Sequence, residues 1–83
     1  MIRFKLKELI AKKEFLDERR VTLKQIAEAT GINRMTLTKI NTQHGYSTST
    51  ETLNKLCKYF DCEIADLVEY ISDEKFQEMT SKD

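Results

Sequence analysis

Turn-forming residues are scarce in this 83-residue sequence, which has no proline and only two glycines. Sheet proteins draw on both residue types for their turns, so the composition disfavours an all-β fold and favours helices. No apolar run approaches the roughly 18 residues that span a bilayer, and residues 1–13 lack the apolar core of a signal peptide. We therefore expect a single helical domain in the cytoplasm, without membrane contact.

Residues for catalysis or metal binding are equally sparse. The only histidine is His44, and the only cysteines, Cys57 and Cys62, are too few for the disulfide framework of a small secreted protein. Their spacing, with no second Cys/His pair, is also weak for a metal site, so we expect two thiols in the core. No nucleophile-base set or glycine-rich phosphate loop occurs, and the sequence predicts no enzyme, no cofactor and no small-molecule ligand.

The net charge is zero, but the charges are unevenly distributed. Residues 1–46 carry ten Lys or Arg against five Asp or Glu, whereas residues 47–83 carry four against nine. The basic half can approach phosphates while the acidic half points away, which is the asymmetry that binding to nucleic acid requires. On charge alone, an ordinary solvated surface explains the pattern equally well.

Apolar residues recur at helical spacing in five segments. The first helix is predicted from about Arg3 to Leu16, and the fifth carries the apolar positions from Ile64 to Ile71. These helices predict an all-α, compact five-helix domain over residues 1–71, followed by a polar tail at 72–83 that is helical or frayed. The other three helices are predicted at residues 23–30, at residues 34–43, and from a Thr48 to Glu51 capping box to Phe60.

The junction between the second and third helices carries the clearest functional signal. Thr22 and Gln25 form a T-x-x-Q capping box at the start of the second helix. Ala27 is small where another helix must pass closely, and Gly31 can adopt the left-handed conformation that ends a helix and turns the chain. The remaining motif positions are Ile32, which plugs the corner, Asn33, which caps the third helix, and Leu37 and Ile40, which face inward.

The third helix has two chemically different faces. At about 100° per residue, its outward arc spans roughly 140° and lies opposite the apolar positions. This arc contains no acid, although a helix shaped only for solubility usually mixes Glu with Lys. A helix that enters the major groove needs hydrogen-bond donors and a group that contacts thymine methyls. The arc consists of Arg34, Met35, Thr38, Lys39 and Thr42.

The run "LKQIAEATGINRMTLTKI" resembles the helix-turn-helix of the phage Cro and repressor-like (XRE-type) superfamily. The later run "ETLNKLCKYFDCEIADLVEY" resembles the fourth and fifth helices of its small stand-alone bacterial members, so the resemblance covers about residues 1–71. It implies a regulator of transcription that binds double-stranded DNA. The segment between the first two helices is longer and more charged than in compact members of the family, and no role follows for it from the sequence.

The resemblance also implies roles for individual residues. Base edges are expected to meet Arg34 and Met35, with Thr38 and Lys39 one turn on. Leu23 stands where the family often has a phosphate-binding Gln, so Lys24 and the helix N-terminus are expected to take that contact. The full set of expected phosphate contacts is Thr22, Lys24, Asn33, Thr42, His44 and Tyr46.

Two questions about partners stay open at this point. One such domain contacts only half an operator, so a homodimer on an inverted repeat is expected, with Tyr70, Phe76 and Met79 as its partner surface; a disordered tail is the alternative. The rival function is a protein-protein interaction module, such as an antitoxin or adaptor, because a fold does not determine its function.

Overall fold

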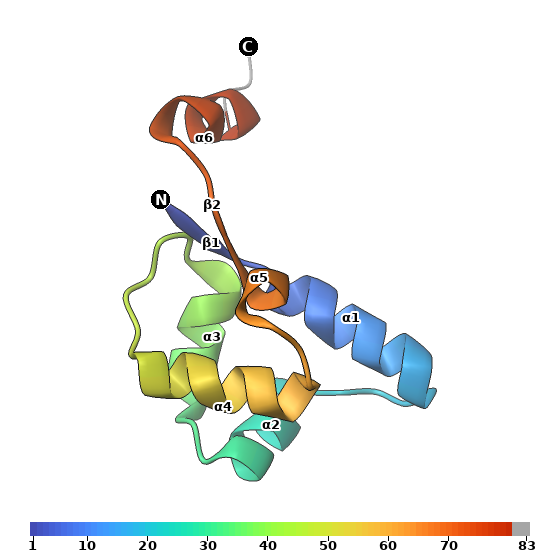
Figure 1. The fold of residues 1–83 in the computed structure, drawn as a ribbon. Coiled ribbons are helices and arrows are strands. Elements are labelled where there is room, and N and C mark those ends of the chain that lie inside the picture. Colours follow the sequence, from blue (N-terminus) through green and yellow to red (C-terminus); the bar gives the residue numbers. More distant parts are fainter. Residues whose placement is uncertain (81–83) are drawn as a thin grey trace.

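The computed structural model describes residues 1–80, and for Met79 and Thr80 it describes only the backbone. The fold is mostly helical and confirms the all-α prediction, with one small sheet added (Figure 1). Within the described part, no helix is long and apolar enough to cross a bilayer. The elements are β1 (Ile2–Phe4), α1 (Leu6–Asp17), α2 (Leu23–Thr30), α3 (Arg34–Thr42), α4 (Thr50–Phe60), α5 (Ile64–Leu67), β2 (Val68–Tyr70) and α6 (Asp73–Thr80).

The core forms where α1 to α5 meet, because each of these helices contributes one fully buried aliphatic side chain. Burial of one such side chain stabilises the fold by roughly 1.5 to 3 kcal/mol. Four further aliphatic residues, Val21, Ile32, Ile40 and Ile71, are almost completely buried. The five fully buried residues are Leu6, Ile26, Leu37, Leu56 and Leu67.

The two ends of the predicted five-helix region differ from the sequence prediction. The first helix begins at Leu6 rather than near Arg3, and the fifth ends at Leu67 rather than at Ile71, because the residues beyond each helix pair as antiparallel strands. Ile2 lies opposite Tyr70 in this register. The backbone N–H of Lys5 donates to the Leu67 carbonyl at 2.7 Å, and at the opposite end of the strand pair Ile71 N–H donates to the Met1 carbonyl at 2.8 Å.

Two smaller differences concern α4 and the tail. Ser49, not Thr48, is the N-cap of α4, because its hydroxyl accepts a hydrogen bond from Thr52 N–H and the helix starts one residue later than predicted. Helix α6 occupies Asp73–Thr80 and projects away from the other helices at the end of β2 (Figure 1). The tail is therefore helical over these residues, and residues 81–83 lie outside the described part of the chain.

Candidate nucleic-acid interface

The turn between α2 and α3 has the predicted construction. Gly31 has φ of +78°, in the left-handed region, and its N–H donates to the Ala27 carbonyl at 2.8 Å. A Cβ atom built on Gly31 would meet no other atom within 4 Å, so glycine is favoured here by backbone conformation and not by lack of space. Ala27 packs against the core and Ile32 is buried in the corner, which sets α3 firmly against α2.

Side chains cap the N-termini of both helices, as the sequence predicts. Thr22 Oγ1 accepts from Gln25 N–H at 3.2 Å, and Gln25 Oε1 accepts from Thr22 N–H at 3.1 Å. Asn33 Oδ1 accepts from Met35 N–H at 2.7 Å. The side-chain amide nitrogen of Asn33 has no hydrogen-bond partner within residues 1–80, so it can donate to a group outside the protein.

The outer face of α3 is exposed, and its inner residues Leu37 and Ile40 are buried, as predicted. Met35 is 63% exposed beside the exposed Arg34. Thr38 Oγ1 donates to the Arg34 carbonyl at 3.1 Å, and Thr42 Oγ1 donates to the Thr38 carbonyl at 2.8 Å. Because these bonds use the hydroxyl protons, both threonines present a methyl group and an acceptor oxygen to the outside.

The loop after α3 brings two of the other candidate residues together. The Lys39 ammonium lies 5.8 Å from the centre of the Tyr46 ring, close enough for a cation–π contact. Tyr46 also packs against the core, so it holds Lys39 near the C-terminal end of α3. His44 is exposed, but its ring lies edge-on to that of Phe76 at 5.9 Å and so also faces α6. Lys24 stands apart from these residues on the exposed side of α2.

The first turns of α2 and α3 share a feature that distinguishes them from every other helix in residues 1–80. They contain no carboxylate, whereas the first turns of α1, α4, α5 and α6 each contain at least one. The N-terminus of a helix carries a partial positive charge, which a carboxylate in the first turn compensates. Helices α2 and α3 therefore keep the positive potential that attracts anions.

Two exposed arginines, Arg19 and Arg20, lie just before the Thr22 cap and were not among the candidates from sequence. The signal that points to them is local: two adjacent cations precede a helix whose first turn has no acid. Helical periodicity gives no signal for them, because they lie in a loop, outside any helical face.

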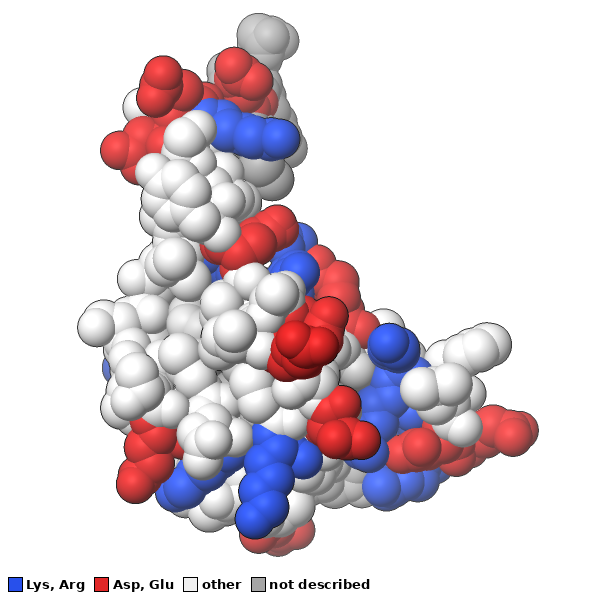
Figure 2. Space-filling view, viewed as in Figure 1, with Lys and Arg blue, Asp and Glu red and all other residues white. Residues whose placement is uncertain are grey.

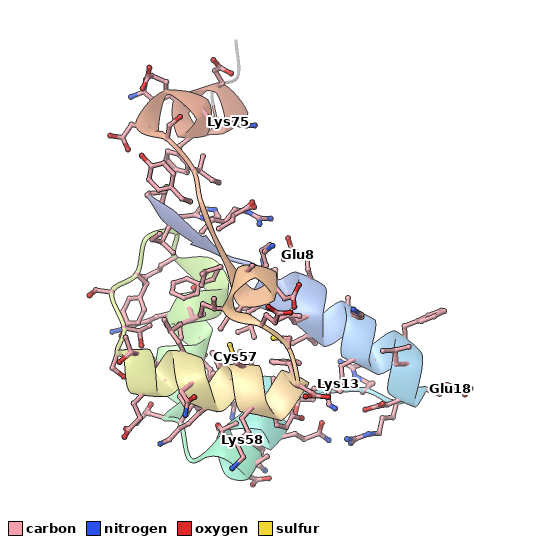
Figure 3. The ribbon with its side chains drawn as sticks, in the orientation of Figure 1. Glu8, Lys13, Glu18, Cys57, Lys58 and Lys75 are labelled. Carbon is pink, nitrogen blue, oxygen red and sulfur yellow. The ribbon has the colours of Figure 1, made fainter. Side chains whose placement is uncertain are left out.

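The cysteines lie away from this surface. Cys57 packs at the edge of the core, on the side of α4 that faces α5 (Figure 3), and Cys62 is half-buried just beyond the end of α4. Burial, the neighbouring Cys57 thiol and the carboxylates of Asp66 and Asp61 raise the pKa of the Cys62 thiol to about 11. No group of three or more possible metal ligands occurs within the described residues.

Comparison with protein families identifies the domain. The model of the Cro/C1-type helix-turn-helix DNA-binding domain matches residues 5–73, which is most of the chain. The chain belongs to this family. Membership supports a DNA-binding regulator in general terms, and domains of this family are typically not enzymes. Comparisons with curated proteins and with solved structures found no significant match.

Proposed function

We propose that this Cro/C1-type domain is a sequence-specific regulator of transcription that reads the major groove of double-stranded DNA with the outer face of α3. The observation that supports this most strongly is the pair of acid-free first turns in α2 and α3, next to an exposed α3 face that also has no acid. Phosphates would be repelled by carboxylates at these places. The other four helices show that this chain otherwise carries acids there.

In this proposal, Arg34 reads a guanine with its two-pronged guanidinium, because paired donors match the O6 and N7 acceptors of that base. Met35 and the methyl of Thr38 contact thymine methyl groups, and the Thr38 oxygen accepts from the exocyclic amine of adenine or cytosine. Lys39 lies one turn of α3 beyond Arg34 and Met35, where its contact with Tyr46 holds it. From there it reaches either a base or the backbone of the opposite strand.

The phosphate contacts come from the rim of the same face. Lys24 supplies charge, Thr22 and Asn33 supply polar groups at the two helix starts, and His44 and Tyr46 flank the far end of α3. Thr42 is also a phosphate-contacting residue in this proposal, but its hydroxyl is already engaged within α3. It can donate to a phosphate only after its hydroxyl releases the Thr38 carbonyl.

We also propose that two copies bind an inverted repeat with half-sites about 10 bp apart, since one domain covers only half an operator. Residues 1–71 form the DNA-binding domain in this view, and residues 72–83 form the tail. Tyr70 is 73% exposed at the start of that tail, and Phe76 follows it on α6. The side chain of Met79, the third residue of the expected partner surface, is outside the described residues.

The test is a comparison of two variants by fluorescence anisotropy on sequences selected from a random DNA pool. Arg34→Ala should lose discrimination at one position, by about 1 to 3 kcal/mol, because a bidentate base contact is removed. Lys24→Ala should weaken binding to all sequences alike and reduce the salt slope by about one. If Arg34→Ala kept full affinity and sequence preference, α3 would not be reading DNA through this face.

One observation favours the second candidate, a protein-binding module. Phe15 and Leu16, at the end of α1, are 82% and 65% exposed, which is unusual for adjacent large apolar residues. Salt separates the two candidates, because binding through Lys and Arg to phosphates weakens steeply as ionic strength rises, whereas an apolar protein contact does not.

A further inference from the structure

The loop between α1 and α2 is held in one conformation by contacts at both of its ends. Helix α1 stops at Glu18, whose φ of +55° is in the left-handed region and reverses the chain. At the other end, Val21 is buried in the core and its N–H donates to Glu14 Oε2 at 2.9 Å. Glu14 belongs to α1, so this bond ties the end of the loop back to the helix that precedes it.

An ion pair and a cation–π contact fix the last turn of α1, from which the loop departs. Lys13 Nζ lies 3.2 Å from a carboxylate oxygen of Asp17, and the same ammonium lies 5.1 Å from the centre of the Tyr59 ring on α4. Figure 3 shows Lys13 directed toward the end of α4, while Glu18 lies at the outer tip of α1. Residues 18–21 are therefore a fixed corner of the molecule rather than a loose arm.

This corner presents two guanidinium groups. The Arg19 side chain is 57% exposed and approaches Asp17 only at 4.0 Å, and Arg20 is exposed with no ion pair to any residue in 1–80. The loop runs from the end of α1 to the start of α2 (Figure 1), and only Val21 separates the two arginines from the Thr22 cap. The Asp17 carboxylate, the acid nearest to Arg19, is already paired with Lys13.

We infer that Arg19 and Arg20 form a second phosphate-binding point, which grips the DNA backbone outside the base pairs read by α3. The inference rests on the proposed function. Guanidinium groups bind phosphate oxygens through two parallel hydrogen bonds, which makes arginine the better backbone anchor than lysine. Because the corner is already ordered, less conformational entropy is lost on binding than for a flexible basic arm.

The experiment measures the salt dependence of DNA binding for the full chain. The double variant Arg19→Ala/Arg20→Ala should lower the slope of log K against log salt by about two, because each phosphate contact contributes about 0.9. Sequence preference should stay unchanged, since backbone contacts carry no base information. For the wild-type protein, the slope of log K against log salt should fall by the same two on a duplex trimmed at the outer edge of the half-site.

A matched control removes two charges elsewhere. Lys58→Ala/Lys75→Ala takes away exposed lysines on α4 and α6 (Figure 3). Lys58 lies beside Ala29 and Thr30 at the C-terminal end of α2, opposite its Thr22 cap, so this variant should keep the wild-type slope. The pair Arg19→Lys/Arg20→Lys keeps the charge and should recover most of the slope. If the alanine variant folds poorly, Arg19→Gln/Arg20→Gln serves as the test, because it removes both charges and keeps long polar side chains, and it should lower the slope by the same two.

The outcomes separate this inference from the proposed function. An unchanged slope in the alanine variant, with Arg34 still needed for sequence preference, would overturn the second phosphate point alone. An equal loss in the lysine control would overturn it as well, because the effect would then be one of net charge. Absence of salt-sensitive DNA binding by the wild type would overturn both.

Discussion

The helices of this chain fall into two groups by the charge of their first turns. Four helices have an acid in their first turn: Glu8 in α1, Glu51 in α4, Asp66 in α5, and both Asp73 and Glu74 in α6. The first turns of α2 and α3 contain no acid. A carboxylate in the first turn stabilises a helix by about 0.3 to 1 kcal/mol. The helix-turn-helix pair therefore lacks a stabilisation that the rest of the fold uses throughout.

Helices α2 and α3 thus leave the positive charge at their N-termini uncompensated, which lowers their own stability and favours an anionic partner. Both use neutral caps, Thr22 and Asn33, which bond the backbone without cancelling the positive end of the helix. The acids gather elsewhere, and Figure 2 shows them over α6 in particular. An anion approaching the α2 and α3 N-termini meets cations and backbone N–H groups, and the acidic residues of α6 lie on a separate projection.

If the acidic helix α6 joins two copies instead of approaching DNA, substitutions on its apolar side should have a large effect on operator binding. If Tyr70 and Phe76 form the partner surface, the variant Tyr70→Ser/Phe76→Ser should sediment as a monomer. Its affinity for a two-half-site operator should fall by at least roughly 100-fold, because the second domain no longer binds as an intramolecular event. Affinity for one half-site should stay the same. Wild-type protein that remains a monomer on a single half-site would rule out the symmetric dimer.

A smaller effect on DNA affinity is expected when a carboxylate is added to the first turn of α2. Gln25→Glu keeps the capping box of α2 and adds a carboxylate, so thermal stability should rise by about 0.3 to 1 kcal/mol. DNA affinity should fall by about 1 kcal/mol, roughly fivefold, through repulsion from a nearby phosphate. The changes in stability and in binding thus have opposite signs, which thermal melting and anisotropy measure separately.

The variant Glu51→Gln makes the opposite change, because it removes the carboxylate from the first turn of α4. It should lower stability by a similar amount, through the lost dipole interaction and the lost ion pair with Lys55, and leave DNA affinity unchanged. Equal effects of the two variants on DNA binding would mean that only net charge matters. The contrast between the two groups of helices would then have no bearing on function.

Local signals explain which elements could be predicted from the sequence. The limits of α2 and the start of α3 are encoded within a few residues, in the Thr22 to Gln25 box, in Gly31 and in Asn33, and the structure confirms all three. The strands depend on backbone bonds between residues more than 60 positions apart. Ile2–Phe4 and Val68–Tyr70 carry apolar residues whose spacing also suits a helix, so only the long-range pairing decides their conformation.

The same distinction applies to the candidate site. The exposed face of α3 follows from periodicity, because a helix of known limits presents its residues at fixed angles. The contact of Lys39 with Tyr46 joins α3 to its following loop, and the contact of His44 with Phe76 joins that loop to α6; no pattern in the sequence implies either contact. Arg19 and Arg20 gain their fixed position from the contacts that flank them, above all the burial of Val21 and its bond to Glu14.

A weaker effect of the carboxylates is expected at the end of α4, where Asp61 and Asp66 lie near Cys62. Burial, the Cys57 thiol and the carboxylates of Asp66 and Asp61 raise the pKa of Cys62 to about 11, against an ordinary value of 9.0. Since only the thiolate reacts, alkylation of Cys62 by iodoacetamide should stay slow at pH 8 and accelerate up to about pH 11, as peptide mapping by mass spectrometry would show.

Two further measurements follow from this raised pKa of Cys62. The folded chain holds this proton more tightly than the unfolded chain does, so the associated stability is complete below pH 9 and is lost as the pH rises from about 9 to about 11. Asp61→Asn/Asp66→Asn removes the two carboxylate contributions to the raised pKa and should move the alkylation midpoint to lower pH. A Cys62 midpoint at or below 9 in the wild type would show that the acidic half exerts no such local effect, and that its carboxylates act only through the net charge of the molecule.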